Sequence, residues 1–341
     1  MNSHHARLLA ILAALFLVPT PSARSQAQEP PSAEQPKEPQ QSPTIRVSVN
    51  RVNVGVSVSD STGKFVEGLR REDFHIFDNG IEQPITDFLA VEEPAQALML
   101  IEAGPAVYLL EGGHLQAARA FLAGLSPDDR VAVVKYADAP QGLLDFTTDK
   151  QSAGAALDEL SFNLGFGSLN LSASLSKVLD WLAAVQGKKS IVLLSTGVDT
   201  STVKQIQDLL LRLKTTDVRI LAVSLTGNLR NPAPAYKKKG LSPKAAVTEE
   251  EFAEADMLLR QIAETTGGKA YFPENSKELS RIFEQIAQNV RHEFSLAFAP
   301  PEEDGVIHSL EVRVTPGASA PESSYHVDYR HAYLAPPPAN R

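Results

Sequence analysis

The sequence predicts an α/β protein with a doubly wound, mainly parallel sheet, inserted in or flanked by a smaller β-rich module that both chain ends build. Three observations predict this fold class. Short apolar runs alternate with amphipathic helical stretches between residues 95 and 291, and a period of two returns at 44–92 and 292–335. The third is that 43% of the 341 residues are hydrophobic, which is enough for a sizeable core.

The first 27 residues have the features of a secretory signal peptide. A weakly basic start precedes the apolar run 8–19, which is shorter than the about 20 residues that a membrane span needs, and residues 25–27 offer a cleavage site. Residues 28–43, rich in Pro, Glu and Gln, are expected to form an extended linker, and 336–341 a tail. We therefore expect an exported protein, periplasmic or extracellular, without membrane insertion after signal cleavage.

Residues 44–92 are expected to form strands. Apolar residues alternate at 45–49, the phase slips by one residue at 50–51 as in a β-bulge, and alternation resumes at 52–58. Residues 74–77 followed by Asp78, Asn79 and Gly80 predict a hairpin. Alternation at 294–298, 310–314 and 325–329 predicts that the C-terminal β segment, 292–335, packs with 44–92.

The central region, residues 95–291, has strands and helices in turn. Apolar runs predict buried strands at 95–101, 131–136, 190–194, 218–225 and 269–272. Apolar stripes at helical spacing predict helices at 115–125, 171–182, 203–213, 252–263 and 279–290. Residues 227–247, rich in Pro and Lys and free of acidic residues, are expected to form a long loop, either disordered or used for binding.

Composition and motifs exclude several function classes. The chain has no Cys, which excludes disulfides, thiolate metal sites and a Cys nucleophile, and its formal net charge of −9 argues against binding to nucleic acid. Neither a Gly-x-x-x-x-Gly-Lys-[Ser/Thr] nor a Gly-x-Ser-x-Gly motif occurs. We therefore expect a non-enzyme, with an extracytoplasmic hydrolase as a weaker alternative.

Several stretches, in order along the chain, resemble the von Willebrand factor type A domain, and more narrowly the exported bacterial subfamily called the VWFA-related acidobacterial domain. They are residues 66–69 with 72–88, 126–131, 265–271 and 292–300. The resemblance covers roughly residues 44–335. It implies a type A fold for 95–291 and a role in protein interaction or adhesion.

Many type A domains bind Mg²⁺ through an Asp-x-Ser-x-Ser loop, a Thr and a further Asp. The resemblance places these positions at Glu102, Gly104, Ala106, Leu169 and Thr196, so the hydroxyls of the loop and of the Thr position are lost and one carboxylate has become a hydroxyl. Mg²⁺ requires six oxygen ligands in near-octahedral geometry. We therefore expect a degenerate, metal-free site and no cofactor. The alternative is a metal-dependent adhesion protein with a rearranged Ca²⁺ or Mg²⁺ site at Glu102 and Asp199, aided by Ser168.

The predicted rim of this site, residues 103–110 and 163–166, is apolar where the family has hydroxyls. Such residues either form a contact surface for a protein partner or fold inward and close the site. For the first case, the partner-binding candidates are Glu102, Pro105, Tyr108, Phe166, Thr196 and Asp199. The sequence thus predicts an exported, non-enzymatic protein-interaction or adhesion module that binds an unidentified protein.

Overall fold

The computed structural model describes residues 51–92, 94–108, 110, 113–161, 168–230, 248–315 and 325–338. All of them belong to one compact unit, Ser48–Arg341. The predicted signal peptide, the linker and the first half of the N-terminal β signature lie outside the described residues, as does 231–247. Among the described residues, no helix is long and apolar enough to cross a bilayer.

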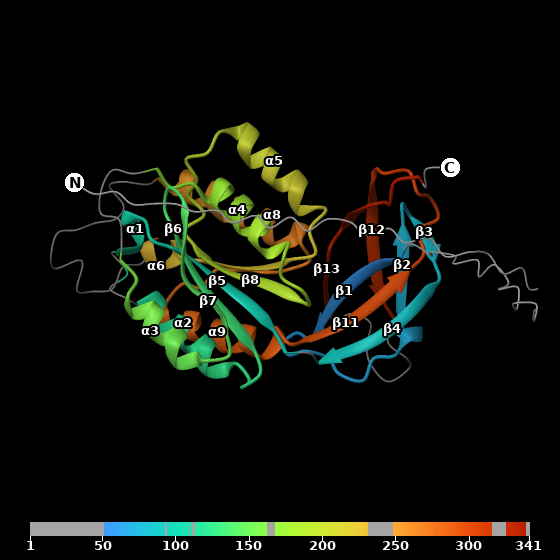
Figure 1. Ribbon diagram of the computed structural model, residues 1–341, viewed down its shortest axis with the longest axis horizontal. Coiled ribbons are helices and arrows are strands. Elements are labelled where there is room, and N and C mark those ends of the chain that lie inside the picture. Colours follow the sequence, from blue (N-terminus) through green and yellow to red (C-terminus); the bar gives the residue numbers. More distant parts are fainter. Residues whose placement is uncertain are drawn as a thin grey trace, which may run out of the picture. The chain divides into compact units, whose positions relative to one another are not determined.

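A six-stranded sheet forms the centre of residues 96–271 (Figure 1). Its strands are β5 (Gln96–Glu102), β6 (Arg130–Tyr136), β7 (Pro140–Thr147), β8 (Lys189–Ser195), β9 (Arg219–Ser224) and β10 (Ala270–Tyr271), in the order β10-β9-β8-β5-β6-β7. Every pairing is parallel except that of β7 with β6. The predicted strands are therefore present, and the sheet is mainly parallel as expected.

Helices cover both faces of this sheet, above and below it in Figure 1. One face carries α2 (Gly113–Gly124), α3 (Lys150–Asp158) and α9 (Ser276–Asn289), and the other carries α4 (Leu171–Leu182), α5 (Val203–Leu213) and α8 (Glu249–Thr265). Residues of β5 show why this happens: Met99 and Ile101 pack on the first side, Leu98 and Leu100 on the second. The predicted doubly wound fold class is confirmed.

β7 and α3 are among the elements of this region that were not predicted from the sequence. β7 is an edge strand with no buried residue, so no apolar run marks it. α3 buries only Ala153, Ala156 and Leu157, a stripe too small to stand out, and it begins because the Asp149 side chain accepts hydrogen bonds from the backbone N–H groups of Gln151 and Ser152.

The expected loop 227–247 begins differently from the prediction. Its first residues belong to the short helix α6 (Thr226–Arg230), and Arg230 forms an ion pair with Asp256 of α8 at 2.8 Å. The prediction of a loop from residue 227 was therefore wrong for these residues, because proline and lysine content says nothing about the ion pair that holds α6.

Strands from the two chain ends form two four-stranded sheets that share one core. The first has the order β13-β1-β11-β4 and the second β14-β12-β2-β3, with bounds β1 (Val52–Ser59), β2 (Phe74–Asp78), β3 (Ile81–Gln83), β4 (Ile85–Glu92), β11 (His292–Phe298), β12 (Ile307–Val314), β13 (His326–Tyr329) and β14 (Ala332–Leu334). β1 pairs with β11 and β13, and β2 pairs with β12, all antiparallel. The β-rich module from both ends, part of the predicted fold class, is thus present; we call it the β module.

The hairpin of the β module forms where the sequence predicts it. Asn79 and Gly80 have φ values of 48° and 81°, which the tight turn between β2 and β3 requires. The core beneath it is aromatic: the ring of Phe294 lies 5.0 Å from that of Phe74 and 5.1 Å from that of Phe65, centre to centre. Because Phe294 comes from the C-terminal segment and the other two from the N-terminal one, neither segment completes this core alone.

Replacing Phe294 by Ala is expected to lower the free energy of unfolding by about 3–5 kcal/mol, since the side chain is 1% exposed and its loss leaves a cavity between the sheets. Urea unfolding measures the change. The control is Leu89→Ala on the neighbouring strand β4, where the side chain is 59% exposed and the expected change is within about 0.5 kcal/mol. Equal losses in the two variants would contradict this account of the core.

Candidate functional site

The candidate site lies where parallel strands β5 and β8 end side by side, the edge at which open α/β sheets bind ligands. Glu102 is the last residue of β5, and Thr196 directly follows β8. The short helix α1 (Pro105–Tyr108) follows Glu102 after a two-residue turn. The sheet therefore brings Glu102 and Thr196 together, although 94 positions separate them in the sequence.

Hydrogen-bond donors surround the Glu102 carboxylate. Its Oε2 accepts from the backbone N–H of Thr196 at 2.6 Å and from the Thr196 hydroxyl at 2.8 Å. The hydroxyls of Ser195 and Tyr136 lie 3.1 and 3.2 Å from the same oxygen. Glu102 and Thr196 have no exposed surface, so neither can contact a partner in this conformation.

Tyr136 and Ser195 were not among the site residues expected from the sequence. They are the last residues of β6 and β8, and their hydroxyls lie 2.6 Å apart beside Glu102. The sequence feature that marks both residues is a hydroxyl side chain at the carboxyl end of a buried strand. Each of these strands is a neighbour of β5, which ends in Glu102. The family's metal-site motif lies in the loops, so it does not point to hydroxyls at the strand ends.

Leu169 packs against the site beside Gly104. Its side chain is buried, and its carbonyl accepts hydrogen bonds from the backbone N–H and the hydroxyl of Thr200, at 2.8 and 3.0 Å. A Cβ atom added at Gly104 would lie 3.3 Å from Leu169 Cδ1 and 3.4 Å from Glu102 Oε1. A side chain at position 104 would therefore be in tight contact with Leu169.

Burial changes the pKa values of this cluster. It raises the pKa of Glu102 above its ordinary value, although hydrogen bonds from Thr196, Ser195 and Tyr136 act in the opposite direction. Burial also raises the pKa of Tyr136, and the adjacent Glu102 adds to this effect. The cluster therefore favours a neutral carboxyl group held by hydroxyls.

The model of one protein family, the von Willebrand factor type A domain, matches residues 115–285, which is half of the chain. This chain belongs to the von Willebrand factor type A domain family. The match runs from α2 into α9, so β5 and Glu102 precede it.

Three solved structures illustrate the similarity of this type A protein to others. The von Willebrand factor type A protein from Catenulispora acidiphila is 10% identical, with 83% of this chain and 75% of that chain covered and a TM-score of 0.44. BatB from Bacteroides thetaiotaomicron is 11% identical, with 58% of this chain and 99% of that chain covered and a TM-score of 0.41. Manganese-loaded TRAP protein from Plasmodium vivax is 12% identical, with 77% of this chain and 100% of that chain covered and a TM-score of 0.42. The comparison with curated proteins finds no significant match.

The residues at the strand ends do not fit the Mg²⁺ site that the type A resemblance implies. A metal ligand needs a free lone pair directed at the ion, whereas Glu102 Oε2 already lies within 3.2 Å of the Thr196 N–H and of the hydroxyls of Thr196, Ser195 and Tyr136. The Thr196 N–H points a partial positive charge at the oxygen that would hold the ion. Leu169 offers no oxygen on its side chain, and it fills the adjacent space.

Asp199 and Ser168, which would join Glu102 in the alternative metal site, are hydrogen-bonded to other residues. Asp199 Oδ2 accepts hydrogen bonds from the backbone N–H and the hydroxyl of Ser172, at 2.9 and 2.5 Å, at the start of α4, and Asp199 Oδ1 accepts from the Ser201 N–H. The Ser168 hydroxyl donates to Asp138. Within the described residues, the group of acidic and His side chains arranged closely enough for a metal ion lies instead in the β module: Glu302, Asp304 and His308.

The remaining candidate contact residues divide between described and undescribed positions. Pro105 is exposed, whereas its neighbours Ala103 and Val107 are buried in the rim. The backbone of Ala106 and Tyr108 belongs to α1. Phe166 and the rest of 162–167 lie outside the described residues. The described part of the rim between β5 and α1 therefore mostly folds inward.

The pH dependence of stability tests the Glu102 cluster. The pKa of Glu102 in the folded protein is raised above its ordinary value of 4.5. As pH rises from the ordinary pKa to the folded-state pKa, the free energy of unfolding therefore falls by about 1.4 kcal/mol per pH unit. Glu102→Gln removes this loss, since its amide group makes hydrogen bonds of both senses with Thr196 and the hydroxyls. We expect the variant to gain stability relative to the unmodified protein as pH rises above 4.5.

Urea unfolding at a series of pH values from 4.5 to 8 measures the effect. Glu284→Gln, at an exposed position on α9, serves as the control and should leave the pH profile unchanged. If Glu102→Gln and the unmodified protein gave parallel profiles, the carboxyl of Glu102 would be ionised without cost and this account would be wrong.

Proposed function

We propose that this chain is an exported, non-enzymatic protein-interaction module whose type A domain binds a protein partner without a metal ion. The observation that carries this proposal is the closed strand-end site, in which Glu102 is wholly buried and hydrogen-bonded by Thr196 and the Ser195 and Tyr136 hydroxyls. A partner cannot coordinate an ion there, so contact must use surface groups. Export is supported by the apolar run 8–19 and the Pro-rich stretch 28–43.

The contact surface that we propose is the groove between α5 and α8, next to the loop after β8. Its volume is about 480 Å³. The apolar part of its lining is Val198, Ile206, Ala255, Met257 and Leu258, and the acidic part is Asp199, Glu251 and Glu254. Met257 is 54% exposed, which is high for a large apolar side chain. Pro105 and Asp199, candidates from the sequence, remain in the proposal as contact residues.

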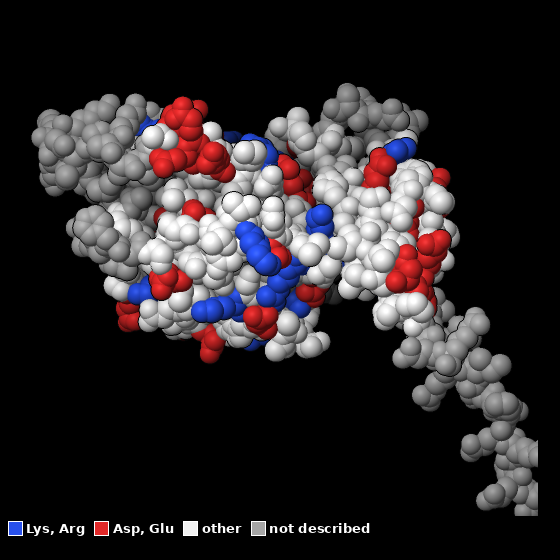
Figure 2. All heavy atoms as spheres, turned by 90° about the horizontal axis from the view of Figure 1, so that it is seen from above, with Lys and Arg blue, Asp and Glu red and all other residues white. Residues whose placement is uncertain are grey.

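The chemistry of this groove selects the kind of partner. Among the described residues that line it, three are carboxylates and none is Lys or Arg. Two further acidic side chains, Glu249 and Glu250, occupy the first turn of α8 beside Glu251. Figure 2 shows groups of acidic side chains at several places on the face that it views. A protein segment that combines apolar and basic side chains complements such a groove.

The test compares capture of proteins from the exported fraction by the unmodified chain and by variants. Capture is expected to be unchanged by a chelator, because no ion takes part, and to fall by tenfold or more, or about 1.4 kcal/mol, for Met257→Asp. A matched control is Leu211→Asp on α5, since Leu211 is also 54% exposed but does not line the groove. Loss of capture in chelator, or equal capture by both variants, would overturn the proposal.

Calorimetry with Mg²⁺ and Ca²⁺ tests the metal-dependent alternative. We expect no heat that depends on Glu102, so the unmodified protein and Glu102→Gln should give the same titration curves. Heat that Glu102→Gln abolishes would favour the rearranged site at Glu102 and Asp199 instead.

A further inference from the structure

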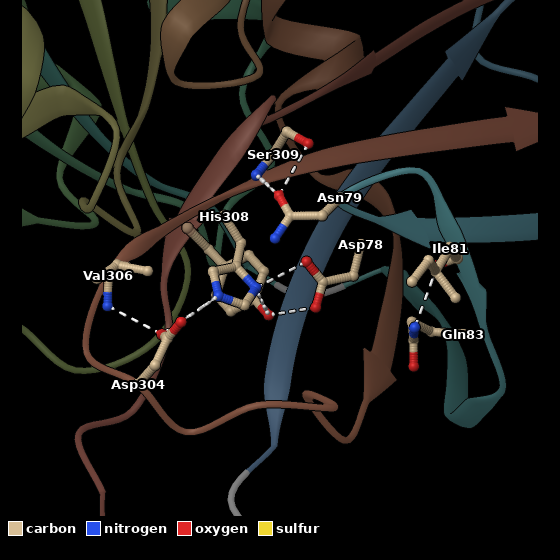
Figure 3. Close-up of polar contacts among 9 residues, drawn as sticks. Asp78, Asn79, Ile81, Gln83, Asp304, Val306, His308 and Ser309 are labelled. Carbon is tan, nitrogen blue, oxygen red and sulfur yellow. Dashed lines mark hydrogen bonds and ion pairs between the residues drawn. The ribbon is translucent and has the colours of Figure 1, made fainter.

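The β module has a cluster of metal-binding side chains that plays no part in the proposed function. The connection between β11 and β12 brings Glu302 and Asp304 to His308, the second residue of β12. One ligand atom from each of the three side chains lies within 4.8 Å of those of the other two. Figure 3 shows Asp304 on one side of the His308 ring and Asp78 on the other.

The two ring nitrogens of His308 have different surroundings. Nδ1 lies 2.9 Å from Asp78 Oδ1, the distance of a strong ionic hydrogen bond, and both side chains are buried, at 2% and 1% exposure for the residues. Nε2 lies 3.2 Å from each of the two oxygens of Asp304. That pair of equal, longer distances is less typical of a charge-assisted hydrogen bond.

The spacing on the Nε2 side fits a shared ion. Ligand atoms at about 2.0–2.2 Å from one Zn²⁺ ion at tetrahedral angles are separated by about 3.3–3.6 Å. The observed 3.2 Å lies just below this range, so Asp304 must move slightly away from Nε2 for an ion to enter. An imidazole with its proton on Nδ1 has the lone pair on Nε2 that a metal requires.

Other residues fix the orientation of the ring independently of the acidic loop. The Tyr333 hydroxyl donates to the second oxygen of Asp78 at 2.8 Å, and Tyr333 is buried. A His that donates its other N–H to a buried carboxylate is the usual arrangement around a protein-bound metal, because it sets the tautomer and raises the basicity of the ligand nitrogen. Asp78 and Tyr333 are thus positioning residues.

Asp304 is also held in place and yet accessible to solvent. Its Oδ1 accepts a hydrogen bond from the Val306 N–H at 3.0 Å, and its side chain is 35% exposed. Glu302 is exposed. An ion can therefore enter from solvent and retain water in the positions that the protein does not fill.

We propose that Glu302, Asp304 and His308 bind a divalent transition-metal ion, with Zn²⁺ as the best chemical match and with water completing the coordination. Imidazole and carboxylate together suit Zn²⁺, whereas Mg²⁺ prefers oxygen ligands alone. Binding uses the Nε2 lone pair and links the β11–β12 connection to strand β12. The proposal is independent of the closed type A site.

Calorimetry of the full chain with ZnCl₂, untagged and stripped with a chelator, tests the site. Asp304→Asn keeps an acceptor for the Val306 N–H but loses the anionic ligand, so it should bind one Zn²⁺ fewer than the unmodified chain. Glu302→Gln should weaken binding tenfold or more, by about 1.4 kcal/mol. The matched control, Glu303→Gln, changes the intervening carboxylate, which is outside the cluster, and should bind as the unmodified chain does. His4 and His5 are present in every variant, so they cancel in the comparison.

A second variant and a second readout keep the test decisive. Tyr333→Phe retains the ring but removes the hydrogen bond to Asp78, and should lower Zn²⁺ affinity about 10–100-fold. Zn²⁺ should raise the melting temperature of the unmodified chain and of Glu303→Gln, but not of Asp304→Asn. Equal stoichiometry, affinity and thermal shift in Asp304→Asn and Glu303→Gln would overturn the proposal, as would the absence of any Zn²⁺ binding.

Discussion

The buried Glu102 carboxyl group is the constraint on which the candidate site depends. A carboxyl group with no exposed surface and no cation beside it is tolerated only where donors surround it, and here strands β5, β6 and β8 end together so that Tyr136, Ser195 and Thr196 supply them. Once these donors are directed at Glu102, they are no longer available to a ligand. The same arrangement that stabilises the strand ends therefore supports our proposal that the type A domain acts without a metal ion there.

Leu169 adds apolar packing at the same strand ends. In place of a hydroxyl it puts an apolar side chain against Gly104, and hydrogen bonds from Thr200 to its carbonyl hold the loop down. The contact surface that we propose uses groups that remain in solvent. The groove with Met257 on its surface and Asp199, Glu251 and Glu254 around it is the neighbouring feature that offers both apolar area and charge.

The β module shows the opposite use of a buried His and carboxylate. Asp78 and His308 are as buried as Glu102, but they are arranged in series, so that Tyr333 holds Asp78, Asp78 holds one ring nitrogen and the other nitrogen points to Asp304 at the surface. Burial there orients a ligand toward solvent instead of closing it off. The two clusters thus differ in whether the last acceptor of the network lies inside the core or at its edge.

Periodicity and turn chemistry in the sequence determined most of the fold, because apolar side chains repeat at the period of the element that buries them: the β5 run at 95–101, the helix at 171–182 and the Asn79–Gly80 turn are all found where they were expected. Elements with little buried surface, such as β7 and α3, leave no such repeat. Glu102, Gly104 and Leu169, at the positions that the resemblance assigns to the metal site, were also visible in the sequence, and the loss of metal binding there stays a prediction. Which groups replaced them was decided only by tertiary structure, because Tyr136 and Ser195 reach Glu102 through parallel strand pairing across 34 and 93 positions of chain. The same holds for Asp78, His308 and Tyr333, since antiparallel pairing of the two chain ends brings together residues whose spacing in sequence has no period.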